Sequence, residues 1–223
     1  MKECGSPSRR RWLAHCSGVG LWLAAGAPMP VGAGGAPATI LVVGDSLSAE
    51  YGLARGSGWV ALLEQRLAAE KIAARVVNAS ISGDTTSGGR SRLPALLAQH
   101  KPTHVVIELG GNDALRGLPL ESTRANLVEM TRAARAAGAR VVVVGMQVPP
   151  NYGRRYADDF AALFGEVAKV EGAALVPFLL AGVADGPDPT ALFQGDRIHP
   201  NADAQPIMLG NVWPVLQPLL RRR

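Results

Sequence analysis

The chain has 223 residues, of which 48% are hydrophobic and 18% are charged. This length and composition fit one domain with a sizeable core, and they exclude an intrinsically disordered or a collagen-like protein. The formal net charge is +5, but four of the 23 basic residues and one of the 18 acidic residues precede position 28. The rest of the chain therefore carries a net charge of only +2, which removes the electrostatic argument for nucleic-acid binding.

Residues 1–27 have the features of a secretion signal. Three arginines at 9–11 precede a mostly apolar run from 12 to 25, and Ala25-Gly26-Ala27 fits a signal-peptidase site. Competing sites place the cleavage as late as residue 38, and the general secretory and twin-arginine routes are both open. We expect an exported protein, periplasmic or secreted, with a Gly/Pro-rich spacer at 28–37.

The leader also contains both cysteines of the chain, Cys4 and Cys16. The mature protein would therefore hold neither a disulfide nor a thiolate metal site. The apolar run of the leader is too short to span a bilayer comfortably. We expect no stable membrane anchor after the leader is removed.

Short apolar runs rich in β-branched residues recur along the remaining chain. Continuous runs of this kind, bounded by Gly, Asn or Pro, are typical of strands that are buried on both faces of a parallel sheet. The predicted strands cover residues 39–43, 75–77, 105–107, 141–144 and 175–176.

Helical patterns alternate with these runs. Apolar residues recur at helical spacing at positions 59, 62, 63 and 67, at 127, 130 and 134, and at 156, 160, 163, 164 and 167. Alternating strands and helices indicate βαβ units, that is, one α/β domain over residues 38–223 with helices on both faces of the sheet. In such folds the functional residues lie in loops at the carboxyl ends of the strands.

Four segments with chemically useful residues stand after predicted strands or just before the last helical stretch. They cover residues 44–48 (Gly-Asp-Ser-Leu-Ser), 80–86, 110–113 (Gly-Gly-Asn-Asp) and 196–201. Taken singly, each has an ordinary explanation as a turn, a helix cap or a surface ion pair. We expect Ser46 to start the helix that follows the first strand.

Together these segments supply the parts of a serine hydrolase. Ser46 would be the nucleophile, His199 the general base and then acid, and Asp196 the carboxylate that orients the imidazole. The backbone N–H groups of Ser46 and Gly83, with the side-chain amide of Asn112, would form an oxyanion hole. The sequence thus predicts acyl transfer through an acyl-enzyme on Ser46.

The same residues carry a family resemblance. Gly44-Asp45-Ser46-Leu47, Gly83, the 110–113 block and Asp196-x-x-His199 resemble the blocks of the GDSL, or SGNH, hydrolases. Longer stretches at 77–85, 109–117, 151–156 and 199–206 are similar to its periplasmic multifunctional esterase branch, known as thioesterase I, lysophospholipase L1 or arylesterase. The resemblance covers about residues 39 to 220.

The resemblance implies a flavodoxin-like three-layer α/β/α fold with a five-stranded parallel sheet. It also implies hydrolysis of aryl or short-chain esters, fatty acyl thioesters and lysophospholipids, with no cofactor or metal, and we expect a monomer. In that branch the acyl chain is bordered by loops that correspond here to Gly111, Leu115, Met146, Val148 and Pro149. Glu50 and Arg197 depart from the family pattern, since small residues are common at both positions.

Other functions fit parts of the pattern. A deacetylase or an acyltransferase of O-acylated glycans would use the same serine. A metal-dependent phosphoesterase could use Asp45, Asp84 and Asp113, although no histidine accompanies them and each can cap a helix or turn instead. A non-catalytic acyl-binding module would not need the complete set of catalytic residues.

Overall fold

The structure is a computed structural model that describes residues 37–221. The predicted leader, and the predicted spacer as far as residue 36, lie outside the described residues. A parallel five-stranded sheet has the strand order β2-β1-β3-β4-β5. The strands confirm the five predicted ones and extend slightly beyond them: β1 (Ala38–Gly44), β2 (Ala74–Asn78), β3 (His104–Glu108), β4 (Arg140–Val144) and β5 (Ala174–Val176).

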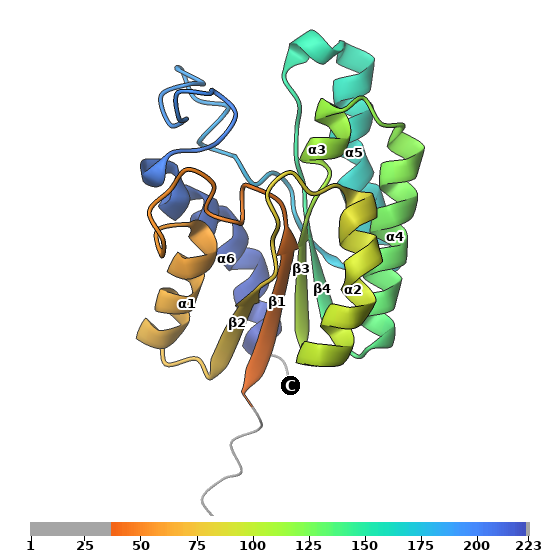
Figure 1. The fold of residues 1–223 in the computed structure, drawn as a ribbon, viewed down its shortest axis with the longest axis vertical. Coiled ribbons are helices and arrows are strands. Elements are labelled where there is room, and N and C mark those ends of the chain that lie inside the picture. The colour runs from red at the N-terminus through yellow and green to blue at the C-terminus, as the bar shows by residue number, and fades with distance from the viewer. Residues whose placement is uncertain (1–36, 222–223) are drawn as a thin grey trace, which may run out of the picture. The chain divides into compact units, whose positions relative to one another are not determined.

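Helices cover both faces of this sheet, which confirms the predicted three-layer α/β/α arrangement (Figure 1). One face carries α1 (Trp59–Ala69) and α6 (Gln205–Arg221), and the other carries α2 (Thr86–His100), α4 (Leu120–Ala136) and α5 (Arg154–Glu171). Three shorter elements lie between them: α3 (Gly111–Leu115), η1 (Pro150–Tyr152) and η2 (Ala202–Ala204). Within residues 37–221 no helix is both long and apolar enough to cross a bilayer.

The core lies on both sides of the sheet. Side chains of the central strands β1 and β3 are almost completely buried, with Ile40, Val43 and Ile107 at 0% exposure. On the α5 side, Phe160 packs edge-on against Phe164 with 5.2 Å between the ring centroids. Burial on two faces explains why these strands read as continuous apolar runs rather than as alternating ones.

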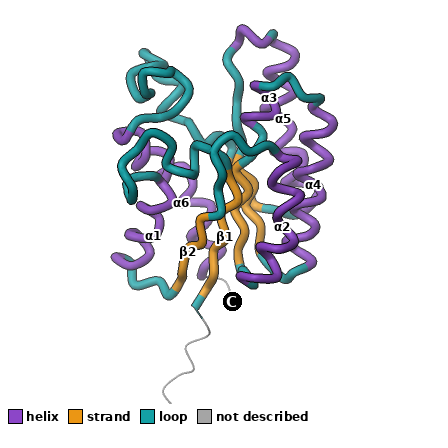
Figure 2. The backbone as a smooth tube through the Cα atoms, in the orientation of Figure 1, coloured by secondary structure: helices purple, strands orange, loops and turns teal. Residues whose placement is uncertain are grey.

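The strand order reverses at β1, which lies between β2 and β3. The chain therefore leaves the carboxyl ends of these neighbouring strands toward opposite faces of the sheet, and a crevice opens at such a reversal point. The loops gather at the upper end of the strands in Figure 2. Ser46 follows β1, Gly83 follows β2 and Asn112 follows β3, so the sheet brings three loops with predicted site residues to one edge.

The expectation that Ser46 starts the following helix is wrong, because α1 begins only at Trp59. Ser46 instead lies in a single helical turn, in which the N–H of Ala49 donates to the carbonyl oxygen of Asp45 at 3.0 Å. The turn ends at Glu50, which has a φ of 59°. This left-handed conformation is unfavourable for residues with a side chain and stops the helix from continuing.

The two departures from the family pattern share this backbone conformation, since Arg197 has a φ of 58°. Small residues, glycine above all, adopt it at the lowest cost. At Glu50 the carboxylate compensates by accepting hydrogen bonds from the N–H groups of Gly56 and Gly58, the latter at 2.8 Å. Glu50 therefore orders the loop between the first turn and α1.

Candidate active site

Ser46, His199 and Asp196 form a continuous hydrogen-bonded chain. The Ser46 Oγ lies 2.9 Å from the His199 Nε2, and the His199 Nδ1 lies 2.7 Å from the Asp196 Oδ2. The serine comes from the turn after β1 and the other two residues from the loop before η2, with His199 153 positions after Ser46. The structure thus brings together the three residues that the sequence predicts to act in concert.

The Asp196 carboxylate is held in its ionised form. Its pKa is lowered to about 2 by hydrogen bonds from the backbone N–H groups of His199 and Ile198, followed by the bond to the His199 side chain. An ionised carboxylate can only accept, so the facing His199 Nδ1 must carry a hydrogen. In the neutral imidazole, the hydrogen on Nδ1 leaves the Nε2 with a lone pair that can accept from the serine hydroxyl.

The three donors that the sequence predicts for an oxyanion hole come from the loops after β1, β2 and β3. Within the part of the chain that the structure describes, the backbone N–H groups of Ser46 and Gly83 have no hydrogen-bond partner. Gly83 has a φ of 79°, a conformation that favours glycine. The Asn112 amide donates to the Asp45 Oδ2 at 3.0 Å and keeps a second hydrogen for a ligand.

Asp45 is a buried carboxylate with a structural task. Burial raises its pKa to about 6, although hydrogen bonds from the Leu47 N–H and the Asn112 amide act in the opposite direction.

The other two acids that the sequence suggests as metal ligands also have partners. Asp84 pairs with Arg92 at 2.8 Å, and Asp113 accepts from the Thr86 N–H at 2.9 Å. Among residues 37–221 no group of three potential ligands could hold a metal ion.

Two residues that the sequence analysis did not identify connect the serine and histidine loops. The Tyr51 ring lies over the His199 ring, with centroids 4.3 Å apart. Gln194 donates from its amide to the carbonyl oxygens of Tyr51 at 2.9 Å and Pro200 at 3.0 Å, and its N–H donates to the His199 carbonyl at 2.8 Å. No sequence motif contains both loops, so only the fold reveals this link.

Behind the serine turn lies a buried network that the sequence analysis also missed. The Glu108 side chain is fully buried at the end of β3, and its Oε2 accepts from the Ser48 hydroxyl at 2.7 Å. The indole N–H of Trp59 donates to the same hydroxyl at 3.2 Å. The network ties the serine turn to β3 and to the start of α1.

The predicted acyl-chain groove remains a prediction. Leu115 and Pro149 are exposed, Gly111 and Val148 are half-buried, and Met146 is buried. A separate cavity of about 380 Å³ has none of these five residues in its lining; it is formed by Ser87, Arg90, Asp113, Leu118, Pro119, Ser122, Ala125 and Asn126.

Comparison with known proteins identifies a family and several relatives that this chain is similar to. The model of the GDSL-like Lipase/Acylhydrolase family matches residues 42–206. This range begins in β1 and ends at the start of α6, so it contains all of the predicted triad and oxyanion residues.

Several characterised relatives match most of the chain. Esterase TesA of Pseudomonas aeruginosa is 57% identical over 182 residues, which cover 82% of this chain and 89% of that protein. Thioesterase 1/protease 1/lysophospholipase L1 of Escherichia coli K12 is 43% identical and covers 82% of this chain and 85% of its own length. The crystal structure of the psychrotrophic esterase EstA from Pseudoalteromonas sp. is 41% identical, with a TM-score of 0.76 over 82% of this chain and 99% of that one.

Proposed function

Because the chain belongs to the GDSL-like lipase/acylhydrolase family and is a serine esterase of that family, we propose that Ser46 is its nucleophile. His199 is then the general base and Asp196 the residue that orients it. The observation that carries this assignment is the hydrogen-bonded chain from the serine hydroxyl through the imidazole to the carboxylate, with distances of 2.9 and 2.7 Å.

The first half of the reaction forms an acyl-enzyme. The His199 Nε2 takes the hydroxyl proton while the Ser46 Oγ attacks the carbonyl carbon of the ester or thioester. Collapse of the tetrahedral intermediate breaks the bond to the alcohol or thiol, which leaves with the proton from His199. In the second half, water attacks the acyl-enzyme by the same route, and the products are a carboxylic acid and the free serine.

The tetrahedral intermediate carries a negative charge on the former carbonyl oxygen. The N–H groups of Ser46 and Gly83 and the amide of Asn112 are the donors that we assign to this oxygen. Among the described residues the two N–H groups have no competing partner, so neither must break a hydrogen bond before the charge develops. Donors fixed in advance in this way lower the activation barrier.

The substrates are small esters or thioesters, in keeping with the esterase and thioesterase relatives. More specifically, we propose arylesterase, thioesterase and lysophospholipase activities, which the relatives' names describe, with acyl-CoA as the thioester substrate. The leader predicted at 1–27 supports export to the periplasm or medium. We propose that the protein is a monomer. We also propose that its acyl groove is bordered by Gly111, Leu115, Met146, Val148 and Pro149.

Replacement of the nucleophile tests this proposal. Ser46→Ala should reduce the hydrolysis of p-nitrophenyl butyrate by about 10⁵- to 10⁶-fold, as for other serine hydrolases. Ser91→Ala is the matched control, because Ser91 is an exposed serine on α2 whose hydroxyl only contacts the Ser87 carbonyl. A p-nitrophenyl phosphonate should add its mass to the peptide that contains Ser46. Equal rates in Ser46→Ala and the control, or labelling of a different residue, would exclude the proposed nucleophile.

A further inference from the structure

Exposed apolar side chains are concentrated around the candidate active site. In the part of the chain that the structure describes, six large hydrophobic side chains are exposed, and five of them follow the carboxyl ends of strands or flank the histidine. We call these five the apolar rim; they are 36% to 54% exposed and comprise Tyr51, Ile81, Leu115, Tyr152 and Ile198. The sixth, Val170, is 75% exposed and lies near the opposite end of α5.

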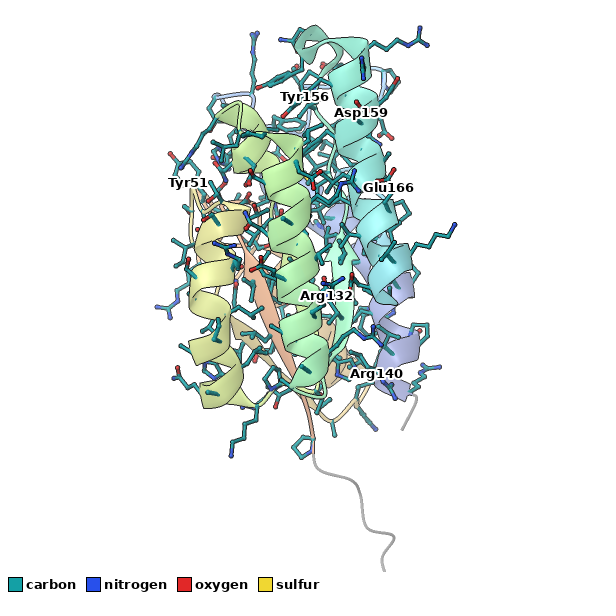
Figure 3. The ribbon with its side chains drawn as sticks, turned by 90° about the vertical axis from the view of Figure 1, so that its right-hand side faces the viewer. Tyr51, Arg132, Arg140, Tyr156, Asp159 and Glu166 are labelled. Atoms are coloured by element: carbon teal, nitrogen blue, oxygen red, sulfur yellow. The ribbon has the colours of Figure 1, made fainter. Side chains whose placement is uncertain are left out.

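The rim borders the site itself. The Tyr51 ring lies against the His199 ring. Ile198 directly precedes His199 in the chain. Figure 3 shows Tyr51 and Tyr156 in the upper half of the view and Arg140 at the other end. The Tyr152 ring stacks on the Tyr156 ring, so Tyr152 also lies at the upper end.

The two remaining rim residues stand on the oxyanion side. Ile81 precedes Gly83 by two residues, and Leu115 ends the short helix that carries Asn112. Each rim residue therefore comes from a different connection between a strand and the next long helix, and four of these five connections supply all of the proposed catalytic groups.

Exposed arginines accompany three of the five rim residues. Arg116 follows Leu115, Arg197 precedes Ile198, and Arg154 and Arg155 come directly after the Tyr152–Gly153 turn; the side chains of all four arginines are exposed. Alternation of apolar and cationic side chains on one face is the composition that favours a boundary between hydrocarbon and phosphate groups. Each arginine near an anionic lipid surface adds attraction that salt weakens.

We propose that the apolar rim docks on the surface of an anionic phospholipid layer, with the active site facing the lipid. The proposal rests on the esterase function above and adds where the enzyme meets its acyl substrates. Any macromolecule that covers the rim also covers Ser46 and His199. A folded protein or a second copy of the chain would close the site, whereas a lipid layer contains the acyl esters that the site hydrolyses.

Binding to vesicles tests docking independently of catalysis. The probe is diether phospholipid vesicles, which contain no hydrolysable ester, made of phosphatidylglycerol with phosphatidylethanolamine or of phosphatidylcholine alone. Wild type and Ser46→Ala should cosediment equally well with the anionic vesicles, more weakly with phosphatidylcholine, and less at high salt. Absence of wild-type binding to both kinds of vesicle would overturn the proposal, while the p-nitrophenyl assay would still report on the proposed function.

Substitution of rim residues that have no catalytic role provides the specific test. The double variant Ile81→Ser/Tyr152→Ser should weaken vesicle partition by about 10- to 100-fold, since each substitution removes the gain from burying a large apolar side chain. Val170→Ser is the matched control, because it removes an even more exposed apolar side chain from the other end of the domain, and it should bind as wild type does. Equal weakening in the control would overturn the proposal.

The activity of the double variant separates docking from chemistry. Hydrolysis of water-soluble p-nitrophenyl acetate should stay within about twofold of wild type, while hydrolysis of a long-chain lysophospholipid held in anionic vesicles should fall with the partition. Light scattering in the absence of lipid measures the molar mass, and so tests whether a second copy of the chain covers the apolar rim. A dimer that the double variant abolishes would overturn the proposal, and a monomer in both proteins would support it.

Discussion

The guanidinium group of Arg116 donates a hydrogen bond of 2.7 Å to the carbonyl oxygen of Gly83. Arg116 directly follows α3, and its backbone N–H donates to the carbonyl oxygen of Asn112 at 3.2 Å. The side chain therefore connects two loops that follow different strands, β2 and β3, and that each supply one proposed oxyanion donor. We infer that Arg116 fixes the distance between these donors.

Arg116→Ala should therefore lower kcat for a water-soluble ester by about 10-fold with little change in KM, because misplaced donors affect the transition state more than the bound substrate. Arg116→Lys can restore part of the rate by donating to the same carbonyl. Arg155→Ala is the control, because its side chain is 97% exposed and only approaches Asp159 at 3.8 Å. Steady-state kinetics of the three variants check this, and an unchanged kcat in Arg116→Ala would contradict it.

Asn112 provides its proposed oxyanion donor from its side chain, so a substitution can remove that donor. Asn112→Ala should lower kcat by about 10²- to 10³-fold with a nearly constant KM, as expected for the loss of one oxyanion-hole donor. The variant also leaves the buried Asp45 carboxylate without its amide partner, so thermal unfolding must be measured alongside. A dominant rise in KM would instead identify Asn112 as a residue that binds the substrate in its ground state.

Combining the two substitutions tests the connection between them. If Arg116 acts by positioning Gly83 relative to Asn112, the double variant should lose less activity than the two single losses multiplied together. Such non-additivity is expected for residues that act as a unit. Strictly multiplicative losses would show that Arg116 acts on a different part of the site.

Asp196→Asn should lower kcat by about 10³- to 10⁴-fold, because an amide can stabilise the wrong imidazole tautomer. The folded-state pKa of Asp196 is about 2, below its ordinary value. Its contribution to stability is therefore complete above about pH 4 and is lost as the pH falls toward 2. The free energy of unfolding of the wild type should thus fall more steeply than that of the variant over this range, and urea titrations measure both. Parallel curves would contradict the assignment.

The sequence was sufficient to predict the fold, and to place the candidate catalytic residues in loops that the fold brings to one edge, because both have local signatures. The apolar runs at 39–43 and 141–144 are typical of strands buried on two faces, and with the helical patterns between the runs they indicated a parallel sheet with its functional loops at one edge. Ser46, Gly83 and Asn112 each follow a strand directly. Their meeting at the β1 switch point follows from the topology and needs no knowledge of side-chain packing.

The supporting contacts could not be predicted because they join residues that no spacing relates. Gln194 reaches the Tyr51 carbonyl across 143 positions, and Glu108 reaches Ser48 across 60. The conformation of Glu50 was equally hidden, since an acidic residue gives no signal for a positive φ. The helix start predicted at Ser46 was wrong for this reason: the left-handed residue ends the first turn long before α1.

Glu108 is the buried acid from which we expect the clearest dependence of stability on pH. Burial, and then repulsion from the Asp45 carboxylate, raise its pKa well above the ordinary value. Within residues 37–221 its Oε1 has no hydrogen-bond partner, so an ionised Glu108 would leave a buried charge poorly compensated. The folded protein thus binds the Glu108 proton more tightly than the unfolded chain does.

A group of this kind stabilises the fold below its unfolded-state pKa, and the stabilisation is lost as the pH rises through the folded-state value. Glu108→Gln cannot ionise and keeps an oxygen that can accept from the Ser48 hydroxyl. The wild-type free energy of unfolding should therefore decline, as the pH rises above the ordinary glutamate pKa, more steeply than that of the variant. Glu129→Gln on the exposed face of α4, where the carboxylate pairs with Arg90, is the control and should follow the wild type. Urea titrations measure the free energy of unfolding at each pH. If its dependence on pH is the same in Glu108→Gln as in the wild type and Glu129→Gln, Glu108 is ionised in the folded protein and its network holds a charge.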